Sequence, residues 1–85
     1  MVVTGISPAA ARVETAVREL AASGGDIFQA TSIVLAIVGA GGRAVVAEVA
    51  DDLRPQLAEA PDDAVLRRAT FLVEEMLRLR VWIRQ

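Results

Sequence analysis

The sequence predicts an all-α fold, a compact bundle of about four helices that forms a single domain across residues 1–85. Apolar residues recur at three- and four-residue spacing along most of the chain, which is the spacing of one helix face. Glycine or proline clusters interrupt this spacing at three points, and the residues after each break suit a helix start. The predicted helices span approximately residues 7–22, 27–38, 43–54 and 62–83.

The first helix is predicted to begin at Ser7 and Pro8. A serine side chain can accept from free N–H groups of the first turn, and proline suits the first helical position. The apolar residues at helical spacing are Val13, Ala16, Val17 and Leu20. The sequence Ser-Gly-Gly at 23–25 then ends the helix.

The second helix follows Asp26, which forms a predicted capping box with Gln29 three residues later. Residues 27–38 are apolar almost all round, and a helix of this kind is expected in the centre of a bundle. Its β-branched residues leave a strand as the alternative.

A glycine cluster at Gly39, Gly41 and Gly42 separates the second helix from the third. With Ala44 it fits the G-x-G-x-x-G/A spacing of dinucleotide sites, but such sites need a strand before the turn and a second parallel strand after it. The chain offers no such sheet. We therefore interpret the cluster as a hinge-like turn, in which glycine supplies positive φ and close backbone approach.

The third and fourth helices differ in how their ends are predicted. Pro55 is expected to end or kink the third helix near Leu53, with at most one further turn over 56–60. The fourth helix opens on acidic residues and carries apolar residues at 4-3-4-3-4 spacing. These residues are Val65, Ala69, Leu72, Met76, Leu79 and Ile83. Residues 77–83 also alternate with period two, so a short C-terminal strand is the alternative there.

The composition excludes several kinds of chemistry. The chain has no cysteine, histidine, tyrosine or lysine, which removes thiolate sites, imidazole bases and Schiff bases. The acidic pairs at 51–52, 62–63 and 74–75 are adjacent on helices and point about 100° apart, which suits a metal poorly. We expect no enzyme activity, no cofactor and no metal. An accessory subunit of an enzyme, working through carboxylates, is one alternative.

The leading hypothesis is a non-enzymatic protein–protein interaction or oligomerisation module, a small adaptor or subunit of a larger assembly. The chain is 54% hydrophobic with a mean hydropathy of +0.46, and so small a domain buries a limited share of its surface. The expected partner is a second copy, as a homodimer or a higher oligomer. Aromatic residues beside arginine are typical of interface centres. The candidate interface residues on the fourth helix are Phe71, Arg78, Val81, Trp82 and Arg84.

One further function is weighed against this hypothesis. A small DNA-binding transcriptional regulator or antitoxin-like protein would use the second helix, the glycine turn and the third helix as a helix-turn-helix. Its recognition helix would carry one arginine and three acids, which repel phosphate, so nucleic acid is not the expected partner.

A membrane span is not expected, because the uncharged stretch 27–42 is shorter than about 20 residues. The sequence begins without the basic start and long apolar core of a signal peptide, so a cytoplasmic location is expected.

Overall fold

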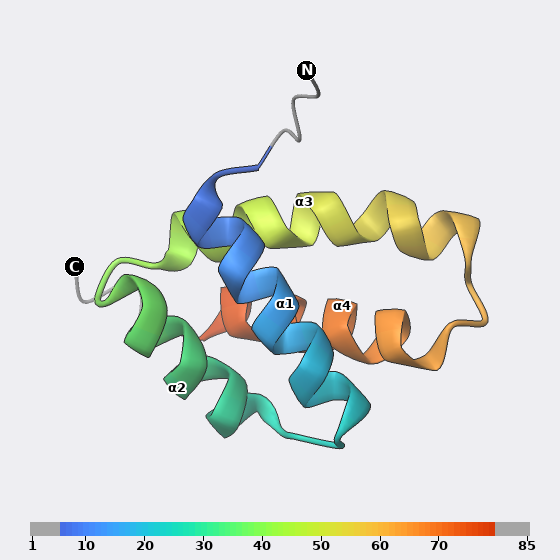
Figure 1. The fold of residues 1–85 in the computed structure, drawn as a ribbon, viewed down its shortest axis with the longest axis horizontal. Helices are drawn as coiled ribbons and strands as arrows, with labels where there is room; N and C mark the ends of the chain where they lie inside the picture. The colour runs from blue at the N-terminus through green and yellow to red at the C-terminus, as the bar shows by residue number, and fades with distance from the viewer. Residues whose placement is uncertain (1–5, 80–85) are drawn as a thin grey trace.

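The computed structural model describes residues 6–79, which form a compact bundle of four α-helices without a strand in that range. The helices are α1 (Pro8–Ala22), α2 (Ile27–Val38), α3 (Arg43–Glu59) and α4 (Ala64–Arg78), joined by short loops (Figure 1). The predicted all-α fold is confirmed, and so are the predicted starts of the first three helices to within one residue.

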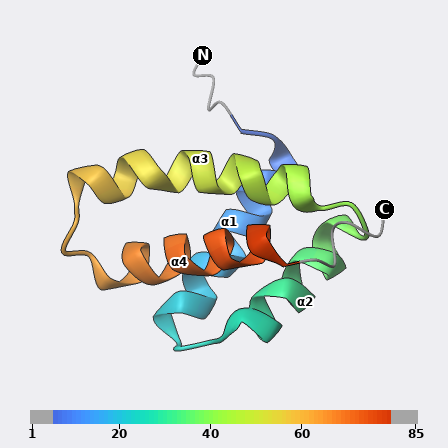
Figure 2. The same ribbon diagram turned by 180° about the vertical axis from the view of Figure 1, so that it is seen from behind.

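The helices form two layers. The α3 and α4 helices run antiparallel side by side, and α1 crosses this pair on one side, as the two opposite views show (Figures 1 and 2). The α1 helix contacts each of the other three helices, whereas α2 lies beside α1 and reaches α4. The molecule is accordingly flat, with extents of 35 × 34 × 18 Å.

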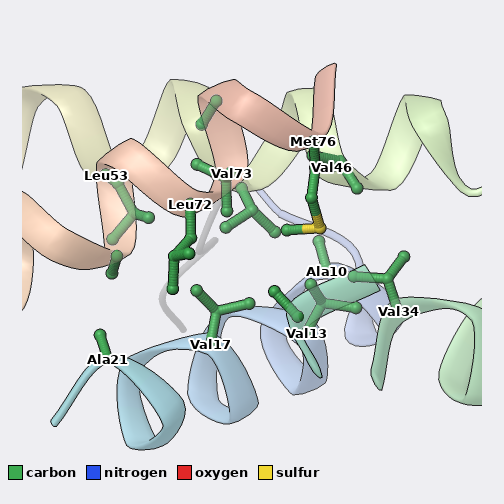
Figure 3. Packing of buried hydrophobic residues seen from close by; sticks show 14 of the residues in the cluster. Ala10, Val13, Val17, Ala21, Val34, Val46, Leu53, Leu72, Val73 and Met76 are labelled. Atoms are coloured by element: carbon green, nitrogen blue, oxygen red, sulfur yellow. The ribbon is translucent and has the colours of Figure 1, made fainter. Parts of the chain in front are cut away.

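The hydrophobic core lies where α1 meets the α3–α4 pair (Figure 3). The α1 and α4 helices supply nine of the fifteen buried hydrophobic residues in the described part of the chain, because apolar residues at three- and four-residue spacing lie on one face of each helix. The largest fully buried side chains are Leu53, Leu72, Met76, Val13, Val17, Val34, Val46, Val49 and Val73. The core therefore consists mainly of valine and leucine, which pack in well-defined rotamers.

The α3 helix continues through Pro55 to Glu59, so the prediction that it ends near Leu53 is wrong, whereas the further turn that the sequence allowed over 56–60 is present. Proline removes one backbone donor, but Pro55 lies on the exposed side of α3, where solvent can reach the freed carbonyl. The Gln56 side chain donates to the backbone oxygen of Asp52 at 3.0 Å, and Leu57 packs against the core. The local hydrogen bond and the tertiary packing of Leu57 stabilise the extra turn that proline disfavours.

The α4 helix begins at Ala64 and ends at Arg78, so it is shorter than predicted at both ends. Asp63 is the N-cap and accepts from the backbone N–H of Leu66 at 3.0 Å. The backbone of Leu79 is extended (φ −67°, ψ 140°), so the predicted helix through this position is wrong. The strand alternative is also wrong at 77 and 78, which are helical, and residues 80–83 lie outside the described part.

The turn between α2 and α3 has the backbone that its glycines predict. Gly39 and Gly41 have φ values of 70° and 82°, a region that other residues rarely adopt. A Cβ on Gly42 would overlap the Cγ2 of Val38, so the chain approaches the end of α2 closely there. The chain direction changes by 116° between the two helices. The hinge-like movement of α2 relative to α3 that this turn would allow stays a prediction.

Candidate interaction surface

The α2 helix is the most apolar helix and also the least buried. Only Ala30 and Val34 of its twelve residues are buried, because α2 lies at the edge of a two-layer bundle and has one side to bury. The prediction that α2 lies in the centre of the bundle is therefore wrong. Phe28 is 82% exposed and Leu35 is 42% exposed.

The exposed side of α2 includes a row of four residues at 4-3-4 spacing, which we call the outer stripe. Residues with this spacing lie along one side of a helix. The outer stripe consists of Phe28, Ser32, Leu35 and Gly39, all of them exposed. It carries no charge, since residues 27–42 include no Asp, Glu or Arg.

The N-terminus of α2 is held by a closed set of hydrogen bonds. Asp26 Oδ1 accepts from the Gln29 backbone N–H at 3.0 Å, and Gln29 Oε1 accepts from the Asp26 backbone N–H at 3.0 Å. This is the predicted capping box. Arg68 Nη2 on α4 donates to the carbonyl oxygen of Gly25 at 2.9 Å. These bonds and the burial of Ala30 fix the inner face of α2, so that the outer stripe faces solvent.

An apolar hollow of about 240 Å³ borders the outer stripe on the α4 side. It is lined by Ile27, Phe28, Thr31 and Leu79. The Thr31 hydroxyl donates to the backbone oxygen of Ile27 at 2.8 Å, so this polar group is satisfied within the helix. The hollow therefore offers apolar contact and no charged group.

Two residues of opposite charge on α1 border the other side of α2. Arg12 and Glu19 line a shallow hollow of about 460 Å³ together with Ile37 of α2. Glu19 also borders a second hollow with Ile33, one helical turn nearer the start of α2. Since α1 and α2 run in opposite directions (Figure 1), Arg12 flanks the C-terminal half of α2 and Glu19 the N-terminal half.

The predicted interface residues on α4 are only partly described. Phe71 is 55% exposed and lines a shallow hollow of about 470 Å³ with Ala64, Arg67 and Arg68. It therefore lies beside arginines, although not those that the sequence suggested. Arg78 is exposed and forms an ion pair with Glu75 at 3.4 Å. The other predicted interface residues, Val81, Trp82 and Arg84, lie outside the described residues.

Sequence reasoning missed the outer stripe because it took the whole of α2 as core. One signal could have revealed it. The exposed side of α2 carries Gln29 and Ser32, whereas the inner side carries Ala30 and Val34. Polar residues on one side of an otherwise apolar helix therefore mark its exposed face.

Sequence reasoning also missed a pair of carboxylates between α1 and α3. Glu14 is 9% exposed, and its Oε2 accepts from Arg18 Nη2 at 3.2 Å and from Gln56 Nε2 at 3.4 Å. The same Gln56 nitrogen donates to Asp52 Oδ2 at 3.0 Å, and Gln56 Oε1 accepts from Arg18. Burial raises the pKa of Glu14, and the neighbouring Asp52 raises it further, against the opposing effects of Gln56 and Arg18. The arrangement joins two helices at the edge of the core, and Glu14 Oε1 is buried in it without a hydrogen-bond partner among the described residues.

Within residues 6–79, no three acidic side chains gather in a way that could hold a metal ion. No single helix in this range has both the length and the apolar character to cross a membrane; α2 and α3 have them only together, and the chain bends by 116° between them.

Comparison with known proteins adds no functional assignment. No protein-family model, no curated protein and no solved structure gives a significant match to this chain. Its function is therefore to be inferred from its own surface.

Proposed function

We propose that the protein is a non-enzymatic protein–protein interaction module and that the outer stripe of α2 is its docking surface. One observation carries the proposal: the most apolar helix of the chain buries only two residues and exposes 82% of Phe28. Large exposed apolar patches on soluble domains typically mark sites of contact with other molecules.

The exposure of Phe28 has an energetic cost that a partner would remove. A phenylalanine buries about 150–250 Å² when it is covered, so Phe28 leaves more than about 100 Å² of apolar surface in water. At about 25 cal/mol per Å², covering it stabilises a complex by roughly 3 kcal/mol before the cost of association. Phe71 and the arginines beside it line a separate hollow on α4.

The chemistry of the surface also favours binding over catalysis. The outer stripe contains no titratable group, and the hollow beside it is lined by apolar side chains and one satisfied hydroxyl. The buried carboxyl of Glu14 lies elsewhere, between α1 and α3, where Arg18 and Gln56 hold it.

A photo-crosslinking amino acid placed in living cells tests the proposal. We expect the residue at position 35 to form protein adducts, detected as mass-shifted bands by immunoblot. The same residue at position 58, exposed on the far part of α3, serves as the matched control and should form none. Adducts to this chain or to another protein both support a docking surface. Absence of adducts at 35, or equal adducts at 58, would contradict it.

A DNA-binding function is the second candidate, because one observation favours it. The α2 and α3 helices are joined by four residues and meet at 116°, within the range of about 90–120° that helix-turn-helix motifs use. The charge of α3 opposes it: Asp51 is exposed, and Glu48 accepts hydrogen bonds from Ser7 at 3.0 and 3.2 Å. A mobility-shift assay with duplex DNA at low salt decides the matter. A shift lost in Arg43→Ala would favour DNA binding, and no shift would exclude it.

A further inference from the structure

We infer that the partner of the outer stripe is a second copy of this chain, packed with α2 antiparallel on α2 about a two-fold axis. This inference rests on the proposed function and names its partner. Three features of the described surface support it: side-chain size along the stripe, absence of charge on it, and opposite charges at its border.

Side-chain size alternates along the outer stripe in a self-complementary way. Phe28 and Leu35 are large, whereas Ser32 and Gly39 are small. When two copies pair antiparallel, the order is reversed across the interface, so Phe28 faces Gly39 of the second copy and Leu35 faces Ser32 of the second copy. Parallel pairing would instead set large against large and leave gaps between the small residues. Close packing therefore favours the antiparallel arrangement.

The charges fit the same arrangement. We place the two-fold axis in the plane of contact and perpendicular to α2, so that the α2 helices of the two copies run in opposite directions. The α1 helices of both copies then lie on the same side of the α2 pair. Arg12, beside the C-terminal half of α2, then meets Glu19 of the second copy, and the symmetry repeats this pair. No like charges meet along the stripe, because residues 27–42 are uncharged. A parallel two-fold arrangement would place α1 of the second copy on the opposite side of α2, so that neither Arg12–Glu19 contact could form.

The size of the face sets the expected strength. The layer formed by α1 and α2 lies on a broad side of a molecule that measures 35 × 34 Å across. A stable dimer buries about 800 Å² on each partner, and one twelve-residue helix with its border buries less. We therefore expect a reversible dimer with a dissociation constant on the order of 10 µM.

Sedimentation equilibrium on the full chain tests the arrangement through a charge swap. We expect Arg12→Glu and Glu19→Arg each to weaken the dimer about three- to tenfold, since each creates two like-charge contacts of modest strength. The double variant Arg12→Glu with Glu19→Arg should restore wild-type affinity. Arg67→Glu, an equal change at an exposed position on α4, is the control and should leave the dimer unchanged.

The outcomes separate this inference from the proposed function. A chain that stays monomeric to about 1 mM overturns the inference, as do single variants without restoration in the double variant. A Leu35→Asp variant that is folded by circular dichroism and still dimerises also overturns it. Crosslinks from position 35 to a different protein, or sedimentation with phosphatidylcholine vesicles in place of dimerisation, would assign the stripe to another occupant. Absence of any adduct at 35 would instead overturn the proposed function itself.

Discussion

The α2 and α4 helices show opposite relations between composition and burial. The α4 helix alternates charged and apolar residues, yet six of its fifteen residues are buried. The α2 helix has no charged residue, yet two of its twelve are buried. The position of a helix in the bundle, and not its hydropathy, decides how much of it is covered. An apolar helix at an edge therefore leaves apolar surface for other molecules.

The largest effect should come from removing core volume on α4. Leu72→Ala leaves a cavity at a side chain that is 1% exposed, so the free energy of unfolding should fall by about 2–5 kcal/mol. Leu35→Ala removes the same atoms from the outer stripe, and should change the free energy of unfolding by less than about 0.5 kcal/mol. Urea titration at protein concentrations too low for self-association measures both. Similar losses for the two variants would show that α2 is covered in solution.

The next effect concerns the turn that places α2 at the edge. Gly42→Ala inserts a Cβ that overlaps the Val38 side chain, and should lower the free energy of unfolding by about 1–3 kcal/mol. Gly39→Ala is the comparison, since its Cβ enters open space but its backbone (φ 70°, ψ −163°) lies in a region that is essentially restricted to glycine. Backbone strain alone should therefore lower the free energy of unfolding by about 1–3 kcal/mol in the same denaturation experiment. A loss at Gly39 with no loss at Gly42 would mean that backbone strain, and not close approach, fixes the turn.

A smaller and more local effect is expected at the cap of α2. Asp26→Ala removes the capping box and should cost about 1 kcal/mol. Because α2 lies at the edge, the loss should appear as faster hydrogen exchange of α2 amides, with little change in α4. Asp63→Ala, the equivalent change at the α4 cap, should instead speed exchange throughout the core. If Asp26→Ala speeds hydrogen exchange equally in all four described helices, α2 unfolds only together with the other helices.

The smallest effect concerns Glu14, which lies between α1 and α3. Burial raises the pKa of Glu14 above its ordinary value of 4.5. Between pH 4.5 and the raised pKa, the folded state therefore binds more protons than the unfolded state. This contribution to stability is therefore fully present below pH 4.5 and is lost as the pH rises through the raised pKa. Glu14→Gln should unfold at a higher temperature than the wild type at neutral pH, and the difference should disappear in acid. A lower melting temperature at neutral pH would mean that the Arg18 ion pair outweighs burial.

The sequence predicted what depends on neighbours along the chain and failed where distant residues decide. The caps at Ser7 and Asp26 and the positive φ at Gly39 follow from local chemistry, and all were predicted correctly. The continuation of α3 past Pro55 depends on packing against the core, which no local pattern encodes.

The candidate site shows the same division. The exposure of Phe71 was predicted from its place off the apolar seam of α4, whereas Phe28 was taken as core because apolar residues outnumber Gln29 and Ser32, the two polar residues that mark the exposed side of α2. Glu14 and Asp52 are 38 residues apart, and their convergence depends on how α1 crosses α3.

The central place of α1 has a consequence for synthesis on the ribosome. The α1 helix emerges early, but the valines that it buries are covered by α3 and α4, which follow it in the chain. Until α4 has been translated, both α1 and the apolar α2 lack one of the helices that cover them. Nascent chains that stop before α4 should therefore be substrates for chaperones, and their release from these chaperones should coincide with the synthesis of the last helix.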